Sequence, residues 1–187
     1  MAGFATASDH EKNDGHDFDK DKRGHDKDDI DSEGPFNDAD ILFMQGMIPH
    51  HEQAIEMAEL IPGRTDREEL CELGPEIIEV QEAEIKQLNE WLAEAGVDPD
   101  DHDMAHEDMD GVLTDDEMDD LREAEDQEFD CLFAEYMIRH HEGAIVMSEE
   151  VLEEGRSRRV ADLATEIIDV QQEEIEMMAC WRVNWGC

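Results

Sequence analysis

The sequence MIPHHEQAIEM at residues 47–57 recurs as MIRHHEGAIVM at residues 137–147. Each copy holds two adjacent histidines between methionines, and the second copy follows at an offset of 90 positions. Aligned without a gap, residues 47–91 and 137–181 have 18 identities in 45 positions. A repeat of this kind indicates one supersecondary unit per copy, whose apolar face has to be buried against its neighbour.

Each copy reads as a helix, a short connection and a second helix. The connections are PGRTDRE at 62–68 and EEGRSRR at 153–159, where glycine and proline interrupt the helical pattern. No run alternates with period two, so we expect no sheet. Two tandem helical hairpins bury their apolar stripes only against each other. The sequence therefore predicts an all-α fold, an antiparallel four-helix bundle in up-down-up-down order.

The chain divides into a tail and one domain. The tail is acidic, has almost nothing to bury, contains His10, His16 and His25, and is predicted to be disordered. In the linker, Thr114 and Glu117 form a capping box that predicts a short helix before the third main one. The predicted boundaries are 1–36 for the tail and 37–187 for a single bundle domain, with repeat 1 at about 38–95, a Met/His linker at about 96–114 and repeat 2 at about 115–183.

Acidic residues dominate the composition. There are 55 Asp and Glu against 14 Lys and Arg, a formal net charge of −41, and Lys86 is the only lysine beyond Asn37. Such a charge argues against binding to nucleic acid. It fits adaptation to a very salty medium or an acidic chain that attracts cations, and the even spread of the excess favours the first. No stretch reaches the length of a transmembrane helix. The N-terminus shows no apolar signal region.

At about 100° per residue, His50 and His51 flank the buried face of their helix, and Gln45, Glu52 and Glu56 lie opposite. On the following helix, Glu84 falls inside the apolar arc. A buried carboxylate without a partner costs several kcal/mol. We therefore expect a protonated histidine or a metal ion from the facing helix beside each such carboxylate. The predicted metal ligands from both repeats are His50, His51, His140, His141, Met47, Met137, Met57, Met147, Glu84 and Glu174, with Gln81 and Gln171 around them.

The donor types favour a soft metal. Di-iron carboxylate bundles use Glu-x-x-His, whereas here Met47-x-x-His50 and Met137-x-x-His140 put a thioether at that position. Thioether with imidazole suits copper, Cu(I) especially, and other transition metals stay open. The linker offers a second, accessory soft cluster, namely His102, Met104, His106 and Met109.

The pattern M-x-x-H-H-x-x-A-I-x-M, followed by E-I-I-x-V-Q-x-x-E-I and a tryptophan, resembles the family of the domain of unknown function 305. The match runs from about Asn37 to Trp181 and covers both repeats. The resemblance implies a ferritin-like helical bundle and an exported protein, some members being implicated in copper binding and resistance. It therefore implies an extracytoplasmic copper-handling protein, although the absence of a visible signal leaves the cytoplasm open.

The sequence thus favours a protein that binds copper for sequestration or transfer and not for turnover. Two alternatives remain. One is a ferritin-like redox enzyme whose histidines and glutamates hold two metals. The other is a metal-free structural or partner-binding bundle in which His–Glu pairs are buried polar groups that stabilise the core.

The four cysteines form no Cys-x-x-Cys motif, which argues against a zinc ribbon. In an up-down-up-down bundle, Cys131 starts the third main helix beside the end of the fourth, while Cys71 lies at the opposite end. We predict that any disulfide joins Cys131 to Cys180 or Cys187 and leaves Cys71 out. Four separate reduced thiols are the alternative.

Overall fold

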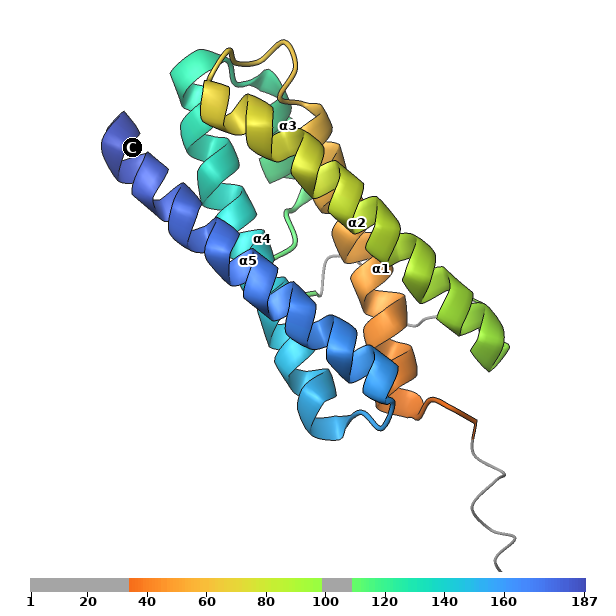
Figure 1. Ribbon diagram of the computed structural model, residues 1–187. Helices are drawn as coiled ribbons and strands as arrows, with labels where there is room; N and C mark the ends of the chain where they lie inside the picture. Colours follow the sequence, from red (N-terminus) through yellow and green to blue (C-terminus); the bar gives the residue numbers. More distant parts are fainter. Residues whose placement is uncertain (1–33, 99–108) are drawn as a thin grey trace, which may run out of the picture. The chain divides into compact units, whose positions relative to one another are not determined.

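The computed structural model describes residues 34–98 and 109–187, and this part of the chain is all-α (Figure 1). Its helices are α1 (Asp38–Glu59), α2 (Glu68–Ala95), α3 (Asp115–Glu123), α4 (Asp126–Glu154) and α5 (Arg158–Trp185). Within those ranges there is no sheet, and no helix is long and apolar enough to cross a membrane. The predicted helical class and both predicted interruptions are confirmed.

Local signals in the sequence account for several helix ends. Asn37 and Asp40 form a capping box at the start of α1, and Thr114 and Glu117 form the one predicted for the short helix α3. Such boxes satisfy backbone N–H groups that have no partner inside the helix. Gly96, with φ of 72°, ends α2 in the left-handed conformation that glycine adopts without strain.

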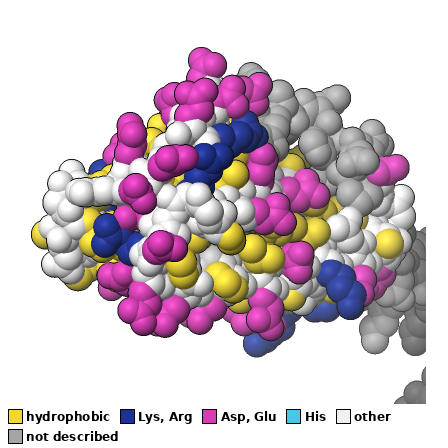
Figure 2. Space-filling view, turned by 90° about the horizontal axis from the view of Figure 1, so that it is seen from above, with side chains coloured by type: hydrophobic (Ala, Val, Ile, Leu, Met, Phe, Trp, Pro, Cys, Tyr) yellow, Lys and Arg dark blue, Asp and Glu magenta, His cyan; other side chains and the backbone are white. Residues whose placement is uncertain are grey.

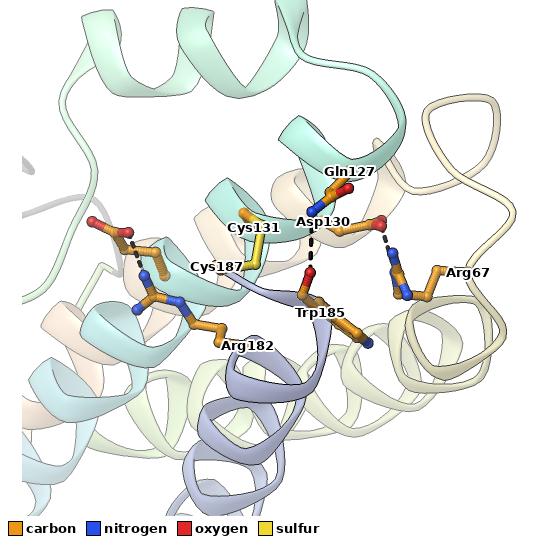
Figure 3. The surroundings of a disulfide bond; sticks show 8 residues. Arg67, Gln127, Asp130, Cys131, Arg182, Trp185 and Cys187 are labelled. Atoms are coloured by element: carbon orange, nitrogen blue, oxygen red, sulfur yellow. Dashed lines mark hydrogen bonds and ion pairs between the residues drawn. A yellow bond between two sulfur atoms is a disulfide. The ribbon is translucent and has the colours of Figure 1, made fainter.

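One end of the molecule brings together the α1–α2 turn, the start of α4 and the end of α5. The Asp126 N–H donates to the Arg64 carbonyl at 2.7 Å. Arg67 forms an ion pair with Asp130, and its guanidinium carbon lies 4.4 Å from the centre of a Trp185 ring (Figure 3). These contacts place the first turns of α2 and α4 at the same end.

The opposite end holds the start of α1, the end of α2 and the α4–α5 turn. The Asp40 carboxylate is fully buried and accepts hydrogen bonds from the backbone N–H groups of Arg156 and Ser157. A side chain of α1 thus binds the turn immediately before α5. Phe36, the last residue of the predicted tail, is buried here, with its ring centre 6.3 Å from that of Trp91.

The directions of the helices differ from the predicted up-down-up-down order. α1 packs antiparallel to α2 and to α4, and α4 packs antiparallel to α5 (Figure 1). Along the chain the long helices therefore run up, down, down and up. The physical reason is that α2 ends at one end of the helices and α4 begins at the other, so the chain between them crosses their length; the described part of it contains α3.

This connection also buries one side of α1 that the sequence assigned to solvent. The Gln45 side chain donates to the Asp98 carbonyl at 3.0 Å, and Gln53 exchanges two hydrogen bonds with the backbone of Leu113. Gln45, which the sequence places opposite the histidine face, is only 4% exposed because the linker contacts it. Helical periodicity assigns such a side to solvent when a linker, and not another helix, covers it.

A disulfide joins Cys131 to Cys187, with Cα atoms 5.6 Å apart (Figure 3). Cys71 and Cys180 are free and exposed. The predicted exclusion of Cys71 and one of the two predicted partners are confirmed. The predicted reason for excluding Cys71 is wrong, because α2 and α4 begin at the same end. Cys71 stays apart because it lies exposed on the other hairpin.

The apolar core consists of two clusters along the length of α1 and α4. One lies towards the α1–α2 turn and includes Met57, Phe129 and Phe133. The other lies towards the start of α1 and includes Met47 and Leu88. Residues 50, 51, 140 and 141 belong to neither cluster and fall between them in both helices, so a polar layer interrupts the core.

Candidate metal centre

Four histidines form this polar layer. His50 and His51 come from α1, His140 and His141 come from α4, and all four are fully buried. The rings of His50 and His140 are in contact, with centres 3.8 Å apart and planes inclined by 43°. The rings of the adjacent pairs His50–His51 and His140–His141 are 6.4 and 6.3 Å apart. The repeats thus bring both histidine pairs into one layer.

Two carboxylates lie on the outer side of the layer. Nε2 of His51 is 2.7 Å from Oε2 of Glu84 on α2, and Nε2 of His141 is 2.6 Å from Oε2 of Glu174 on α5. The second contact also has hydrogen-bond geometry, whereas the first has the distance alone. Each predicted pairing of a glutamate with a histidine of the facing helix is present, but the two glutamates are partly buried and not fully buried as predicted, with 12% and 16% side-chain exposure.

The linker closes another side of the layer. Nε2 of His50 lies 3.2 Å from the carbonyl oxygen of Asp110. Gly143 makes this approach possible, because a Cβ atom there would lie 1.9 Å from the same carbonyl oxygen. The first repeat has Gln53 at the equivalent position, where it binds the linker at Leu113.

The surroundings keep at least one of these imidazoles neutral. The pKa of His140 is well below its ordinary value, chiefly because burial disfavours the charged ring, and the neighbouring His50 adds to the effect. A neutral imidazole carries a lone pair on one ring nitrogen. His140 is therefore an available donor to a metal ion at neutral pH.

Several polar atoms of the layer are buried without a hydrogen-bond partner among the described residues. They are Nδ1 of His51, Nδ1 of His141, and both ring nitrogens of His140. Buried polar groups in proteins are nearly always partnered, so a cluster of exceptions needs an explanation. His51 and His141 resemble metal-binding histidines, which commonly turn their second nitrogen to a carboxylate.

The predicted methionine ligands lie on both sides of this layer. Met47 and Met147 belong to the cluster near the start of α1, whereas Met57 and Met137 belong to the other. Three of them are fully buried and Met147 is half-buried. The four thioethers are thus divided between the two clusters.

No three His, Cys, Asp or Glu side chains converge closely enough to hold a metal ion in the described ranges. The arrangement is two His–Glu pairs around a central His–His contact. Of the accessory cluster, Met109 is buried, and His102, Met104 and His106 lie outside the described residues.

Two residues at this site were not predicted. Asp110 contributes a backbone carbonyl, and no sequence pattern marks which peptide of a linker meets a histidine. Gly143 could have been found from the sequence, because the second repeat has this glycine where the first has Gln53.

The comparisons with known proteins concern the family and the fold of this chain. The family model described as "Domain of unknown function (DUF305)" matches residues 40–182. No curated protein matches the chain. Among solved structures, a DUF305 protein from Streptomyces coelicolor, described as a candidate secreted protein, is 29% identical with a TM-score of 0.72, covering 80% of this chain and 93% of that one.

Two further structures are similar. A DUF305 fragment from Deinococcus radiodurans is 28% identical with a TM-score of 0.70, over 78% of this chain and 95% of its own. CopM in its Cu(I)-bound form is 32% identical with a TM-score of 0.67, over 78% of this chain and 96% of its own. CopM is also solved in Cu(II)-bound, Ag-bound and apo forms.

Proposed function

This chain belongs to the DUF305 family, and on that premise we propose that it binds copper at the histidine layer, for sequestration or transfer. The proposal treats the four long helices as one ferritin-like bundle that encloses the layer. The single observation that carries it is the group of buried ring nitrogens of His51, His140 and His141 that have no partner among the described residues.

The chemistry of the donors supports copper over harder ions. Imidazole and thioether are soft ligands, and Cu(I) accepts low coordination numbers. The contact between the His50 and His140 rings offers a starting pair. Met47 and Met137, one turn before these histidines, are flexible enough to complete the shell. Glu84 and Glu174 would then orient His51 and His141.

The similarity to CopM supports the same reading. That protein is known in Cu(I)-bound, Cu(II)-bound and Ag-bound forms, and the identity is 30–32% over most of both chains. Silver is a useful probe for this protein because it resembles Cu(I) and does not change oxidation state under ordinary conditions.

The first prediction tests the layer. Replacing His50, His51, His140 and His141 by alanine should remove tight Cu(I) and Ag(I) binding. Losing an orienting partner alone typically weakens metal affinity by about 10–100-fold, and losing the ligands should exceed that. Competition with a chromophoric chelator measures the affinity. The matched control is Met177→Ala, which removes a partly exposed thioether. Unchanged affinity and stoichiometry in the four-histidine variant would refute the proposal.

A metal-free structural role is the second candidate. The pairs His51–Glu84 and His141–Glu174 favour it, because each carboxylate already has a partner without metal. Metal analysis of protein purified without an affinity tag separates this reading from copper binding. Oxidase and peroxidase assays of the loaded protein separate storage from a redox enzyme.

We also propose that the protein works outside the cytoplasm. The Cys131–Cys187 disulfide suits an oxidising compartment. The Streptomyces coelicolor relative, described as a candidate secreted protein, points the same way. Detection of the protein in an extracytoplasmic fraction of its source cells is the test.

A further inference from the structure

A small cavity lies between α2 and α5, beside the two His–Glu pairs. Its volume is about 10 Å³, and its polar walls are Gln81 and Glu84 from α2 and Gln171 and Glu174 from α5. These are equivalent positions of the two repeats, so each hairpin supplies one amide and one carboxylate. A space of this size holds about one water molecule or one small ion.

The two amides point to a ligand. Gln81 and Gln171 are 3% and 4% exposed, and the Oε1 atom of each is buried without a hydrogen-bond partner in the described part of the chain. Leaving a buried acceptor unsatisfied costs about 1–3 kcal/mol. Two such acceptors at one cavity indicate that something in the cavity satisfies both.

The carboxylates determine the charge of that ligand. Glu84 and Glu174 direct Oε2 towards a histidine, and their side chains keep 12% and 16% exposure. Each carboxylate has a second oxygen that can bind a ligand. The two unpartnered amide atoms are both oxygens, and the other two polar wall residues are carboxylates, so the cavity favours a cation over an anion.

We propose that Gln81, Glu84, Gln171 and Glu174 form a site for a small hard divalent cation of the Mg²⁺ or Mn²⁺ class. Carboxylate and carbonyl oxygens suit these ions, whereas copper prefers the imidazoles and thioethers of the interior. Val80 and Val170 at the rim are partly exposed, so solvent can complete the coordination shell. This site shares Glu84 and Glu174 with the proposed copper site, where they contact His51 and His141, but it needs no bound copper.

The experiment titrates copper-free protein with Mn²⁺ and follows binding by electron paramagnetic resonance. About 1 M tetramethylammonium chloride reduces the screening length to about 3 Å and so weakens binding to surface carboxylates. Its cation is too large for the cavity. We expect one tight Mn²⁺ per chain, displaced by Mg²⁺. The variant Gln81→Leu/Gln171→Leu should lose at least a factor of ten in affinity, with the net charge unchanged.

The matched control is Gln87→Leu/Gln172→Leu, which removes two exposed amides from the same helices and should bind as the wild type does. Absence of a tight Mn²⁺ in the wild type would mean that the cavity holds water only and would overturn the proposal. Equal affinity in the Gln81→Leu/Gln171→Leu variant would also overturn it.

If the Gln81→Leu/Gln171→Leu variant does not fold, pulsed electron paramagnetic resonance of Mn²⁺ in the wild type identifies the ligand atoms. A shell without strong imidazole-nitrogen coupling to Mn²⁺ supports the oxygen site. Strong nitrogen coupling would place the ion in the histidine layer and overturn the proposal. Because copper is absent throughout, neither result depends on the copper proposal.

Discussion

At the scale of single residues, His140 shows how burial determines chemistry. Its ring is fully buried and in contact with His50. Both the loss of solvation and the neighbouring imidazole hold its pKa well below the ordinary value near 6.5. The folded protein therefore takes up a proton at this residue less readily than the unfolded chain does.

This pKa shift predicts that copper-free protein loses stability on acidification. Below about pH 6.5 the unfolded chain binds a proton that the folded protein does not. The free energy of unfolding therefore decreases as the pH is lowered, by at most about 1.4 kcal/mol per pH unit for this group. Above the pKa of the unfolded chain the residue is neutral in both states, so this group causes no loss of stability there. His140→Gln should reduce the slope, as measured by denaturant titration from pH 7.5 to 5 at intervals of about half a unit. Identical slopes in both proteins would contradict the assignment.

At the scale of helices, covalent and polar contacts join α4 and α5 at the end of the hairpin that lies away from their connecting turn. The disulfide joins the first turns of α4 to Cys187, two residues after the end of α5, and Gln127 donates to the Trp185 carbonyl at 3.0 Å (Figure 3). Arg182 pairs with Glu135 at 2.7 Å in the same region. The turn of this hairpin is at the other end, so these contacts prevent α5 from separating from α4.

We predict that Cys131→Ser/Cys187→Ser lowers the free energy of unfolding by about 2–4 kcal/mol, because the cross-link closes a long loop in the unfolded chain. The sequence separation of 56 residues places the expected loss in the upper part of that range. Cys71→Ser/Cys180→Ser is the matched control, since both thiols are free and exposed, and it should change stability little. A similar loss in both variants would show that serine itself, and not the bond, is responsible.

At the scale of the whole molecule, charge is the dominant property. Acidic side chains spread over the face seen in Figure 2, with a few basic ones among them. The basic residues that exist are used in pairs, such as Arg139 with Glu117 and Arg159 with Glu94. With 55 acidic against 14 basic residues, there are too few basic side chains to pair with most carboxylates. Repulsion among the carboxylates therefore opposes the compact state.

The protein should therefore be more stable in concentrated salt than in dilute buffer. Screening shortens the reach of the repulsion from about 10 Å at 0.1 M to about 3 Å at 1 M. We expect the melting temperature to rise steadily with sodium chloride, measured by circular dichroism on copper-free protein. Tetramethylammonium chloride should act in the same direction if screening is the cause. A melting temperature that is flat from about 0.05 M to about 3 M in both salts would exclude self-repulsion as a significant cost.

What the sequence determined by itself is mostly local. Hydrophobic period, glycine and proline breaks, and the capping box at Thr114 depend on neighbouring residues, and they predicted the helices and α3. The repeat of HH motifs identified the histidines that share the buried layer, because an offset copy has to present the same face. The positions of Glu84 and Glu174 inside apolar arcs predicted a histidine or metal partner for each, since a charge removed from water requires one.

Only the tertiary structure decided the directions of the helices and the closure of the histidine layer. Up-down-up-down and up-down-down-up orders bury similar stripes, so periodicity cannot separate them. The choice follows from contacts between distant segments, such as Arg67 with Asp130 and Asp40 with the start of α5. The same holds for the linker peptide beside His50, which Gly143 admits. Such contacts depend on where a long connection lies, and its path is set by packing over the whole fold.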